Sequence, residues 1–339
     1  MPPCQYLALD TDNPLMHLEE KIRQHYVSRL YLDNWTTEET PESSFIWSLN
    51  KITGKTFKTT NLSNIAQKNR FYKVIIDNIV WDMLKYLLDP LQHEPFVART
   101  LRTLNPLLLV NHYRENKLEN YEKLVVIETN FLEDRYADLE GWFAHTIKKI
   151  SAAGSELSGI FEENKEKHYD SLMLFFATQH FRTRRARQRI NEITKDMHLQ
   201  RGHDEKHKLS PQQVDTVTKI HLYVESVRFA ENLSRSNFKI SLDYNVSNID
   251  LVTSSSPTLA RVESRAHRDD ISSFKGQIPL TPKINMRLYQ SSGGGKRIEF
   301  GTLGKQEVLA LNRLQVENSD MDVYATSERQ LQIFLKLLP

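Results

Sequence analysis

The sequence predicts an α+β fold: a mainly helical domain with an N-terminal β-hairpin and a small C-terminal sheet. Apolar residues recur at helical spacing through much of the first 235 residues, and short β-like runs separated by Ser- and Gly-rich loops follow residue 236. Two β-rich runs also flank a Thr53-Gly54 pair. We expect a single domain over residues 1–339, with a helical core at about 14–235 and a β-rich subregion at about 236–339.

The N-terminal region predicts a helix followed by a hairpin. From Pro14 to about Leu32, apolar residues recur close to helical spacing, which indicates a helix with a break near Ser28. Residues 45–60 then read as two strands around Thr53-Gly54, and glycine suits a tight turn because it readily adopts a positive φ. We expect a β-hairpin over these residues.

Helical spacing continues in the middle and at the end of the chain. Asp89-Pro90 separates two of the predicted helices, because a proline disfavours helix in the residue before it. The predicted helices cover about 62–90, 92–104, 128–151, 157–195, 211–233, 303–318 and 327–337. The polar stretch 200–213 predicts a loop, and the predicted late strands are FKISLDYNV, DLVTS, IPLTPKINMRLYQ and DVYAT.

Composition excludes few classes of function. The chain of 339 residues carries 45 basic and 43 acidic side chains, so its formal charge of +2 indicates no particular partner. The single cysteine, Cys4, cannot form an internal disulfide. The first residues lack the basic start and continuous apolar segment of a secretory leader, and the longest apolar runs are too short to cross a bilayer, so we expect neither feature. We expect a cytoplasmic protein that does not enter a membrane.

Two glutamates of the helix predicted at 128–151 are candidates for chemistry. At about 100° per residue, Glu133 and Glu140 project about 20° apart, inside the apolar arc of that helix. Burial of a carboxylate is costly unless a cation, a metal ion or hydrogen-bond donors meet it. A divalent cation is therefore one cofactor that this pair could hold, and the sequence leaves its presence open.

The next predicted helix supplies partners for these acids. Its polar residues at near-helical spacing are Gln179, Arg182, Arg185 and Arg189. A guanidinium pairs well with a buried carboxylate. His25 projects onto the same stripe as Leu18 and Ile22, so we expect its ring to point inward. Two interpretations stay open: a satisfied internal polar network, or a site that combines a general base, a metal ligand and an anion clamp.

The run RTRRARQR at residues 182–189 concentrates positive charge. If Arg184 and Arg187 face solvent, they form a basic patch that can contact phosphates. The alternative is an ordinary solvated helix end, because cations are favourably placed near a helix C-terminus.

In these residues the chain resembles an uncharacterised, mainly bacterial family of similar size, which is known by a His-Tyr-Val-Pro motif followed by Tyr-Leu and Asn-aromatic positions. The matching residues are His25, Tyr26, Val27, Ser28, Tyr31, Leu32, Asn34 and Trp35, with serine in place of the motif's proline. The likeness continues through Thr53-Gly54-Lys55, Asn69, Tyr72, Glu133, Glu140, Gln179, Arg182 and the IPLTP segment at 278–282. Where the family shows Thr-Ser-Asp-Asn-Pro, residues 253–257 read Thr-Ser-Ser-Ser-Pro, so Ser255 replaces the aspartate.

Because the family carries no settled chemistry, the resemblance implies which residues to suspect. With the patterns above, it predicts His25, Glu133 and Glu140 as catalytic residues. The predicted substrate-binding residues are Tyr26, Gln179, Arg182 and Arg185. If the missing aspartate serves catalysis in relatives, Ser255 implies altered or lost activity, because serine cannot act as a carboxylate base.

The first hypothesis is an enzyme that acts on a phosphate-containing substrate, nucleic acid or a nucleotide, such as a host-defence or toxin-like nuclease. His25 would be a general base or metal ligand, the two glutamates would bind a divalent cation or position water, and an arginine would hold phosphate. One alternative is a non-catalytic module that binds nucleic acid or protein. Another is a subunit of a larger assembly, including a homo-oligomer.

Overall fold

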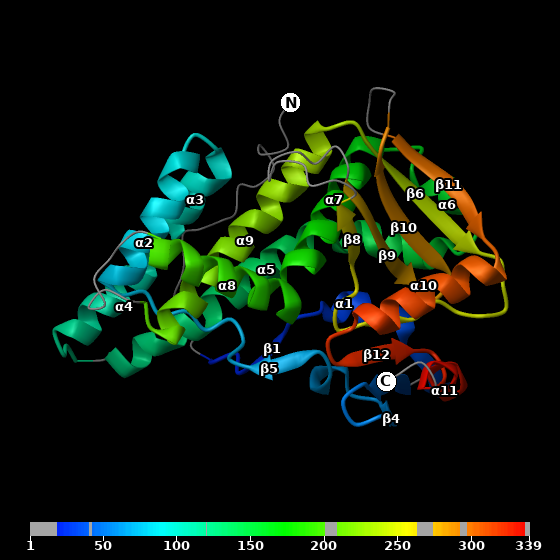
Figure 1. Ribbon diagram of the computed structural model, residues 1–339, viewed down its shortest axis with the longest axis horizontal. Helices are drawn as coiled ribbons and strands as arrows, with labels where there is room; N and C mark the ends of the chain where they lie inside the picture. Colours follow the sequence, from blue (N-terminus) through cyan, green and yellow to red (C-terminus); the bar gives the residue numbers. More distant parts are fainter. Residues whose placement is uncertain are drawn as a thin grey trace. The chain divides into compact units, whose positions relative to one another are not determined.

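The computed structural model of the protein describes residues 19–40, 43–119, 121–200, 209–262, 274–291 and 297–335. These residues fall into two compact units that alternate along the chain (Figure 1). The first unit comprises Met1–Gln24, Lys68–Leu139 and Arg184–Arg228. The second comprises His25–Gln67, Glu140–Thr183 and Phe229–Pro339. The predicted class, α+β and mainly helical, is confirmed.

The first unit is helical. Its helices are α2 (Asn78–Leu88), α3 (Pro95–Thr103), α4 (Asn105–Glu115), the residues 121–139 of α5 (Tyr121–Ala153), α8 (Arg184–Gln200) and the residues 211–228 of α9 (Pro211–Arg235). The Asp77 side chain caps α2 by accepting a hydrogen bond from the Val80 N–H at 2.8 Å. The predicted break at Asp89-Pro90 is confirmed, since α2 ends at Leu88 and a 3₁₀ turn, η4 (Asp89–Leu91), follows.

Aromatic rings fill the core of the first unit. Tyr136 of α5 contacts Tyr72 and Tyr223, with ring centroids 4.8 and 5.5 Å apart. Phe71 and Phe96 extend the cluster at 4.9 and 5.6 Å from Tyr72 and Tyr223, respectively. These tilted and edge-on contacts add to the free energy gained from burying the rings.

The helix predicted over 62–90 is wrong in its first half. That half holds a 3₁₀ turn, η3 (Leu62–Asn64), and the short strand β5 (Gln67–Asn69). The backbone turns at Ala66 and Arg70, which adopt φ values of 49° and 50°. A positive φ in a non-glycine residue is incompatible with a continuing right-handed helix.

The helix predicted over 14–32 is also wrong where the structure describes the chain, and residues 14–18 lie outside that part. Residues 23–35 instead form strand β1 (Arg23–His25), a single helical turn α1 (Arg29–Leu32) and a 3₁₀ turn η2 (Asp33–Trp35). Strand β1 pairs with β5, and the Tyr26 N–H donates to the Ala66 carbonyl at 2.9 Å. A tertiary partner therefore overrides the local helical spacing.

The second unit contains a mixed sheet in the order β11-β6-β10-β9-β8. Its strands are β6 (Phe238–Asn245), β8 (Leu259–Val262), β9 (Phe274–Thr281), β10 (Ile284–Gln290) and β11 (Arg297–Leu303). Strand β11 runs parallel to β6, and the other neighbours are antiparallel. The run IPLTPKINMRLYQ thus forms part of a hairpin, β9 and β10, rather than one strand.

Helices cover the two faces of this sheet. Helix α7 (Lys165–Phe181) packs against one face, where a Cβ on Gly276 would lie only 2.6 Å from the Phe176 ring. Helix α10 (Lys305–Asn318) lies over one end of the other face, since its Asn312 and Gln315 meet Gln277 there. Successive side chains of a strand point to opposite faces, so Gly276 and Gln277 separate the two packing layers.

A second sheet combines strands from an early and a late part of the chain. Its order is β2-β3-β12-β7, with β4 also paired to β3. The strands are β2 (Thr37–Thr40), β3 (Ser43–Asn50), β4 (Lys55–Thr59), β7 (Thr253–Ser254) and β12 (Asp322–Ala325). The predicted hairpin is confirmed, with Gly54 at a φ of +66°. We expected this hairpin to be separate from the C-terminal strands. Instead, its strand β3 pairs with β12.

The helix predicted at 157–195 is interrupted. Residues 157–200 form α6 (Leu157–Ile160), α7 and α8, with Asn164 in the left-handed region before α7. Helices α9, α10 and α11 (Glu328–Leu335) agree with their predictions, whereas α4 was not predicted. The predicted loop at 200–213 falls largely on residues 201–208, outside the described part. Every helix within the described ranges is too short or too polar to cross a bilayer.

Candidate functional site

His25 lies at the end of β1 and is 8% exposed. Its Nε2 is 3.3 Å from the Leu62 carbonyl oxygen, which can only accept, so Nε2 carries the proton and Nδ1 remains an acceptor. Burial lowers the pKa of His25 to about 4; the hydrogen bond to Leu62 opposes this, and the nearby Arg182 and Arg29 charges lower it further. The imidazole is therefore neutral at pH 7.

An ion pair lies within electrostatic range of this imidazole. Arg182, which follows α7 and is 3% exposed, donates from Nη1 to Oε1 of Glu140 on α5. The Glu140 side chain is 23% exposed, so one end of the pair reaches towards solvent. Both charges act on the pKa of His25: Arg182 lowers it and Glu140 raises it. The second unit thus brings together a neutral base, an acid and a guanidinium.

Gln179 adds an unusual polar group to the same helix end. It lies three residues before Arg182, on the same face of α7, and is fully buried. Neither atom of its side-chain amide has a hydrogen-bond partner among the residues that the structure describes. The buried hydroxyls of Thr178 and Ser28 lack partners in the same sense. Native proteins satisfy most buried polar groups, so these atoms indicate a place where a ligand or water is expected.

The other predicted site residues are placed differently. Tyr26 is buried in the second unit beside His25 in the chain. Glu133, half-buried, and Arg185, exposed, belong to the first unit. Arg187 is not at the solvent as the basic-patch hypothesis requires: it pairs with Asp215 and lies 4.6 Å from the centre of the Phe71 ring. Of the predicted site residues, His25, Glu140 and Arg182 act on one another electrostatically.

Three motif residues that the sequence marked only by resemblance link the N-terminal segment to the late strands. The Tyr31 hydroxyl lies 2.6 Å from Thr253 Oγ1 and donates to the Pro279 carbonyl at 2.7 Å. Asn34 Nδ2 donates to the Leu280 carbonyl at 2.9 Å, and Trp35 Nε1 donates to the Leu251 carbonyl at 3.2 Å. The motifs are therefore joined directly by hydrogen bonds. Their order along the sequence was the only signal for this contact.

Ser255, where the resemblance implies an aspartate, lies in a buried turn and accepts hydrogen bonds from the backbone. Its hydroxyl accepts hydrogen bonds from the Met321 and Asp322 N–H groups at 3.1 and 3.3 Å. Ser255 is 1% exposed. An aspartate oxygen could fill the same acceptor role, so the substitution preserves the turn.

Two features bear on ligands near the N-terminal motif. A hollow of about 250 Å³ is lined by Leu30, Asp33, Asn34, Ile147, Lys148, Ser151 and Ala152. Burial raises the pKa of the Asp33 carboxyl there, against the opposing charges of Arg29 and Lys148. Across the described ranges, no three His, Cys, Asp or Glu side chains gather as metal ligands would. A cation beside His25 and Glu140 would need further ligands from water or substrate.

Comparison with known proteins identifies the family of this chain. No curated protein and no solved structure matches the chain. The model of the family described as "Protein of unknown function (DUF4238)" matches residues 23–329, a range that contains His25, Glu140 and Arg182 as well as the residues that join the motifs. The chain therefore belongs to the DUF4238 family.

Proposed function

We propose that the protein is an enzyme that acts on a phosphate-containing substrate, a nucleic acid or a nucleotide, at the cluster formed by His25, Glu140 and Arg182. The observation that carries this proposal is the neutral His25 imidazole within electrostatic range of the buried Arg182 and of its half-buried partner, Glu140. Nuclease chemistry is its most specific form. A cytoplasmic location, suggested by the single cysteine, is part of the proposal.

A phosphate group would make His25 a better base. With a pKa of about 4, the free imidazole accepts protons weakly, because burial and the charges of Arg182 and Arg29 disfavour its cation. A bound phosphate brings negative charge that stabilises the imidazolium and offsets the two arginines. The pKa then rises towards neutrality, where general-base catalysis is most efficient. Substrate binding and activation of the base are coupled by charge alone.

The remaining groups have roles that fit their contacts. Arg182 is held by Glu140, so its guanidinium is fixed in orientation and its positive charge would attract a phosphate group bound nearby. The buried Gln179 amide supplies a donor and an acceptor one helical turn away. His25 Nδ1 would take a proton from the attacking water or hydroxyl.

The test measures both the pKa of His25 and the cleavage of oligonucleotides. Histidine-labelled protein is titrated by NMR with inorganic phosphate and with single-stranded RNA and DNA oligonucleotides, and oligonucleotide cleavage is measured in parallel. We expect the His25 pKa to rise from about 4 on binding. His25→Gln and Glu140→Gln should reduce turnover by about 10²-fold or more, the usual range for loss of general acid–base catalysis.

His168→Gln is the matched control, because His168 is also buried in the second unit and bonds Thr146 at 2.9 Å. It should leave turnover unchanged. Folded His25→Gln protein with full activity, or a His25 pKa indifferent to every phosphate probe, would contradict the proposal.

A second candidate function, a nucleic-acid-binding module without catalysis, is favoured by the break between α7 and α8. The sequence suggested that the arginine run lies near a helix C-terminus, but Arg184 and Arg185 instead begin α8, whose first turn contains no acidic residue. A helix N-terminus already carries partial positive charge, so cations there reinforce an anion-binding potential rather than neutralise it. Arg185 and Arg189 are exposed on this helix.

This candidate predicts a salt-dependent interaction in the first unit. The double variant Arg185→Gln with Arg189→Gln should weaken oligonucleotide binding and reduce the slope of log affinity against log salt by about 1 to 2, as expected when up to two phosphate contacts are lost. Fluorescence anisotropy at several salt concentrations measures both. Arg102→Gln, an exposed arginine on α3, is the control. An unchanged slope would exclude α8 as the contact surface.

A further inference from the structure

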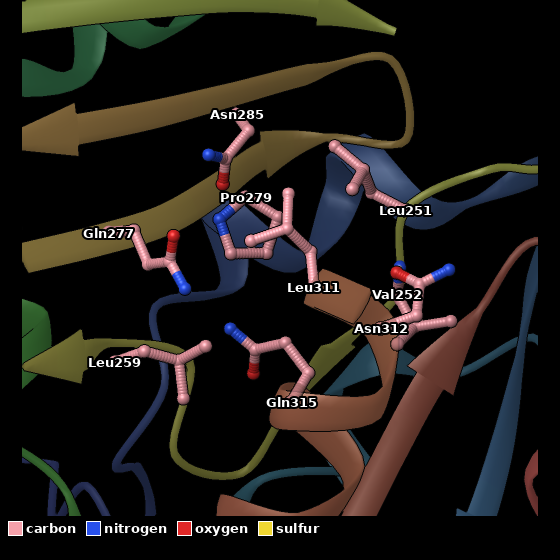
Figure 2. A pocket seen from close by; sticks show the side chains of 9 residues that line it. All are labelled: Leu251, Val252, Leu259, Gln277, Pro279, Asn285, Leu311, Asn312 and Gln315. Atoms are coloured by element: carbon pink, nitrogen blue, oxygen red, sulfur yellow. The ribbon is translucent and has the colours of Figure 1, made fainter. Parts of the chain in front are cut away.

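Two hollows in the described part of the second unit differ in the free space that they offer. The cleft between α10 and β9–β10 is filled by its own lining side chains, which leave no space for a water molecule (Figure 2). The hollow near the N-terminal motif has a volume of about 250 Å³, which is room for several water molecules. A small organic molecule therefore fits in the second hollow and not in the first.

The open hollow lies between the turns that follow β1 and the end of α5. One wall is formed by α1 and η2, and the other by the last turns of α5. Both walls belong to the second unit. The apolar part of the lining consists of Leu30, Ile147 and Ala152. The hollow thus offers an aliphatic surface as well as space.

The η2 wall presents hydrogen-bond acceptors. Asn34 Nδ2 donates to the Leu280 carbonyl at 2.9 Å, so the amide is fixed and its Oδ1 remains an acceptor. The Asp33 carboxylate forms no ion pair or hydrogen bond with any residue that the structure describes. Asp33 is exposed as a whole, yet neighbouring atoms remove water from its carboxyl, and this burial raises the pKa of Asp33. A ligand cation at this wall would replace the lost hydration.

The α5 wall presents hydrogen-bond donors. Lys148 and Ser151 lie three residues apart on α5, so their side chains are neighbours on the helix surface, and both line the hollow. Both are exposed, and neither side chain forms a hydrogen bond or ion pair with another described residue. The ammonium group has three N–H donors, and the hydroxyl has one donor. A carboxylate is the natural complement of this wall.

The opposite characters of the two walls select the charge of the ligand. Asp33 would repel a simple anion, whereas Lys148 and Arg29, whose charges both act on Asp33, would repel a simple cation. A neutral molecule would leave both charges in the hollow without a partner. A zwitterion satisfies both walls, because its ammonium group can meet the acceptors and its carboxylate can meet the donors.

We propose that this hollow binds a small aliphatic amino acid in its zwitterionic form. The ammonium group of the ligand lies at Asp33 and Asn34, and its carboxylate lies at Lys148 and Ser151. Its side chain packs on the apolar lining, where burial adds to the binding free energy. None of the lining residues belongs to the His25 cluster, so the site does not depend on the proposed catalytic function.

Isothermal titration calorimetry on the full chain at neutral pH tests this with L-leucine and with two analogues that each lack one charge. Isocaproate lacks the ammonium group, and isoamylamine lacks the carboxylate. We expect leucine to bind and each analogue to bind at least tenfold more weakly, because each loses a charge-assisted contact. Glycine should also bind more weakly than leucine, because it has no side chain to bury.

Two substitutions assign each charge of the ligand to its wall. Asp33→Asn should weaken leucine at least tenfold without weakening isocaproate, which has no ammonium group. Lys148→Gln should weaken leucine several-fold without weakening isoamylamine, which has no carboxylate. Glu38→Gln and Lys149→Gln, exposed residues that do not line the hollow, are the controls and should leave leucine binding unchanged.

Ala152→Trp provides a third variant, which places a large ring in the hollow. Ala152 is exposed, so the substitution puts the fold at little risk, and it should abolish leucine binding. Absence of leucine binding to the wild-type protein, or equal binding of leucine and both analogues, would overturn the proposal. Leucine binding that Asp33→Asn and Lys148→Gln both leave unchanged would overturn it as well, because the two walls would then not select the ligand.

Discussion

Acidification from pH 6.5 to 4 should lower the free energy of unfolding of the wild-type protein by about 3 kcal/mol more than that of the His25→Gln variant. The unfolded chain protonates this histidine near the ordinary pKa of 6.5, whereas the folded protein does so only near 4. Between these values the unfolded chain binds more protons, so stability falls as the pH falls. The contribution is fully present above pH 6.5 and lost by about pH 4.

Urea unfolding at half-unit pH steps measures the effect as the difference between wild type and variant. His168 provides a comparison, because burial also lowers its pKa and Lys149 and His145 act in the same direction. His168→Gln should therefore change the pH dependence with the same sign. If the His25→Gln and wild-type curves stay parallel over this window, the His25 ring is not buried in neutral form, and the proposed catalytic cluster loses its base.

Arg287→Leu should lower the free energy of unfolding by about 3 kcal/mol, at the lower end of the range for breaking a buried pair, because this arginine is partly exposed. Asp243 is fully buried, and Arg287 contacts its two oxygens at 2.5 and 2.8 Å. The Ser241 hydroxyl supplies the other contact at 2.7 Å. A Cβ on Gly301 would lie 2.5 Å from Asp243 Oδ1, so the carboxylate has little room to turn towards solvent.

A double-mutant cycle with Asp243→Asn measures the coupling between the two charges. The variant that carries both substitutions should recover most of the stability lost in Arg287→Leu, since no buried charge then remains without a partner. Arg313→Leu is the control, because Arg313 is largely exposed and its pair with Glu317 is worth little. A coupling below about 0.5 kcal/mol would show that Asp243 is stabilised by other groups.

The predictions that depend only on neighbouring residues in the sequence were confirmed. The Thr53-Gly54 turn requires a positive φ that glycine supplies, so the hairpin could be read from a few residues. Asp89-Pro90 ended a helix for an equally local reason. The long periodic stretch at 211–233 became α9 with little change at its ends.

Where distant segments decide the structure, local spacing misled. Residues 23–32 carry apolar side chains at nearly helical intervals, yet Tyr26 bonds Ala66 and the segment becomes a strand and a single turn. In the run at 182–189, a helix break moves Arg184 to an N-terminus and a pair with Asp215 removes Arg187 from the solvent. Neither partner can be inferred from spacing.

The sequence by itself determined the fold class, the hairpin turn and the set of polar residues to suspect, because propensity, turn chemistry and motif order are local properties. Only the tertiary structure decided that His25, Glu140 and Arg182 act on one another, that Tyr31 joins the N-terminal motif to Pro279, and that Asn285 Nδ2 is buried with no hydrogen-bond partner among the described residues. Each of these depends on burial and on contacts between residues far apart in the chain, and those set both the charge state of an imidazole and the cost of an unmade hydrogen bond.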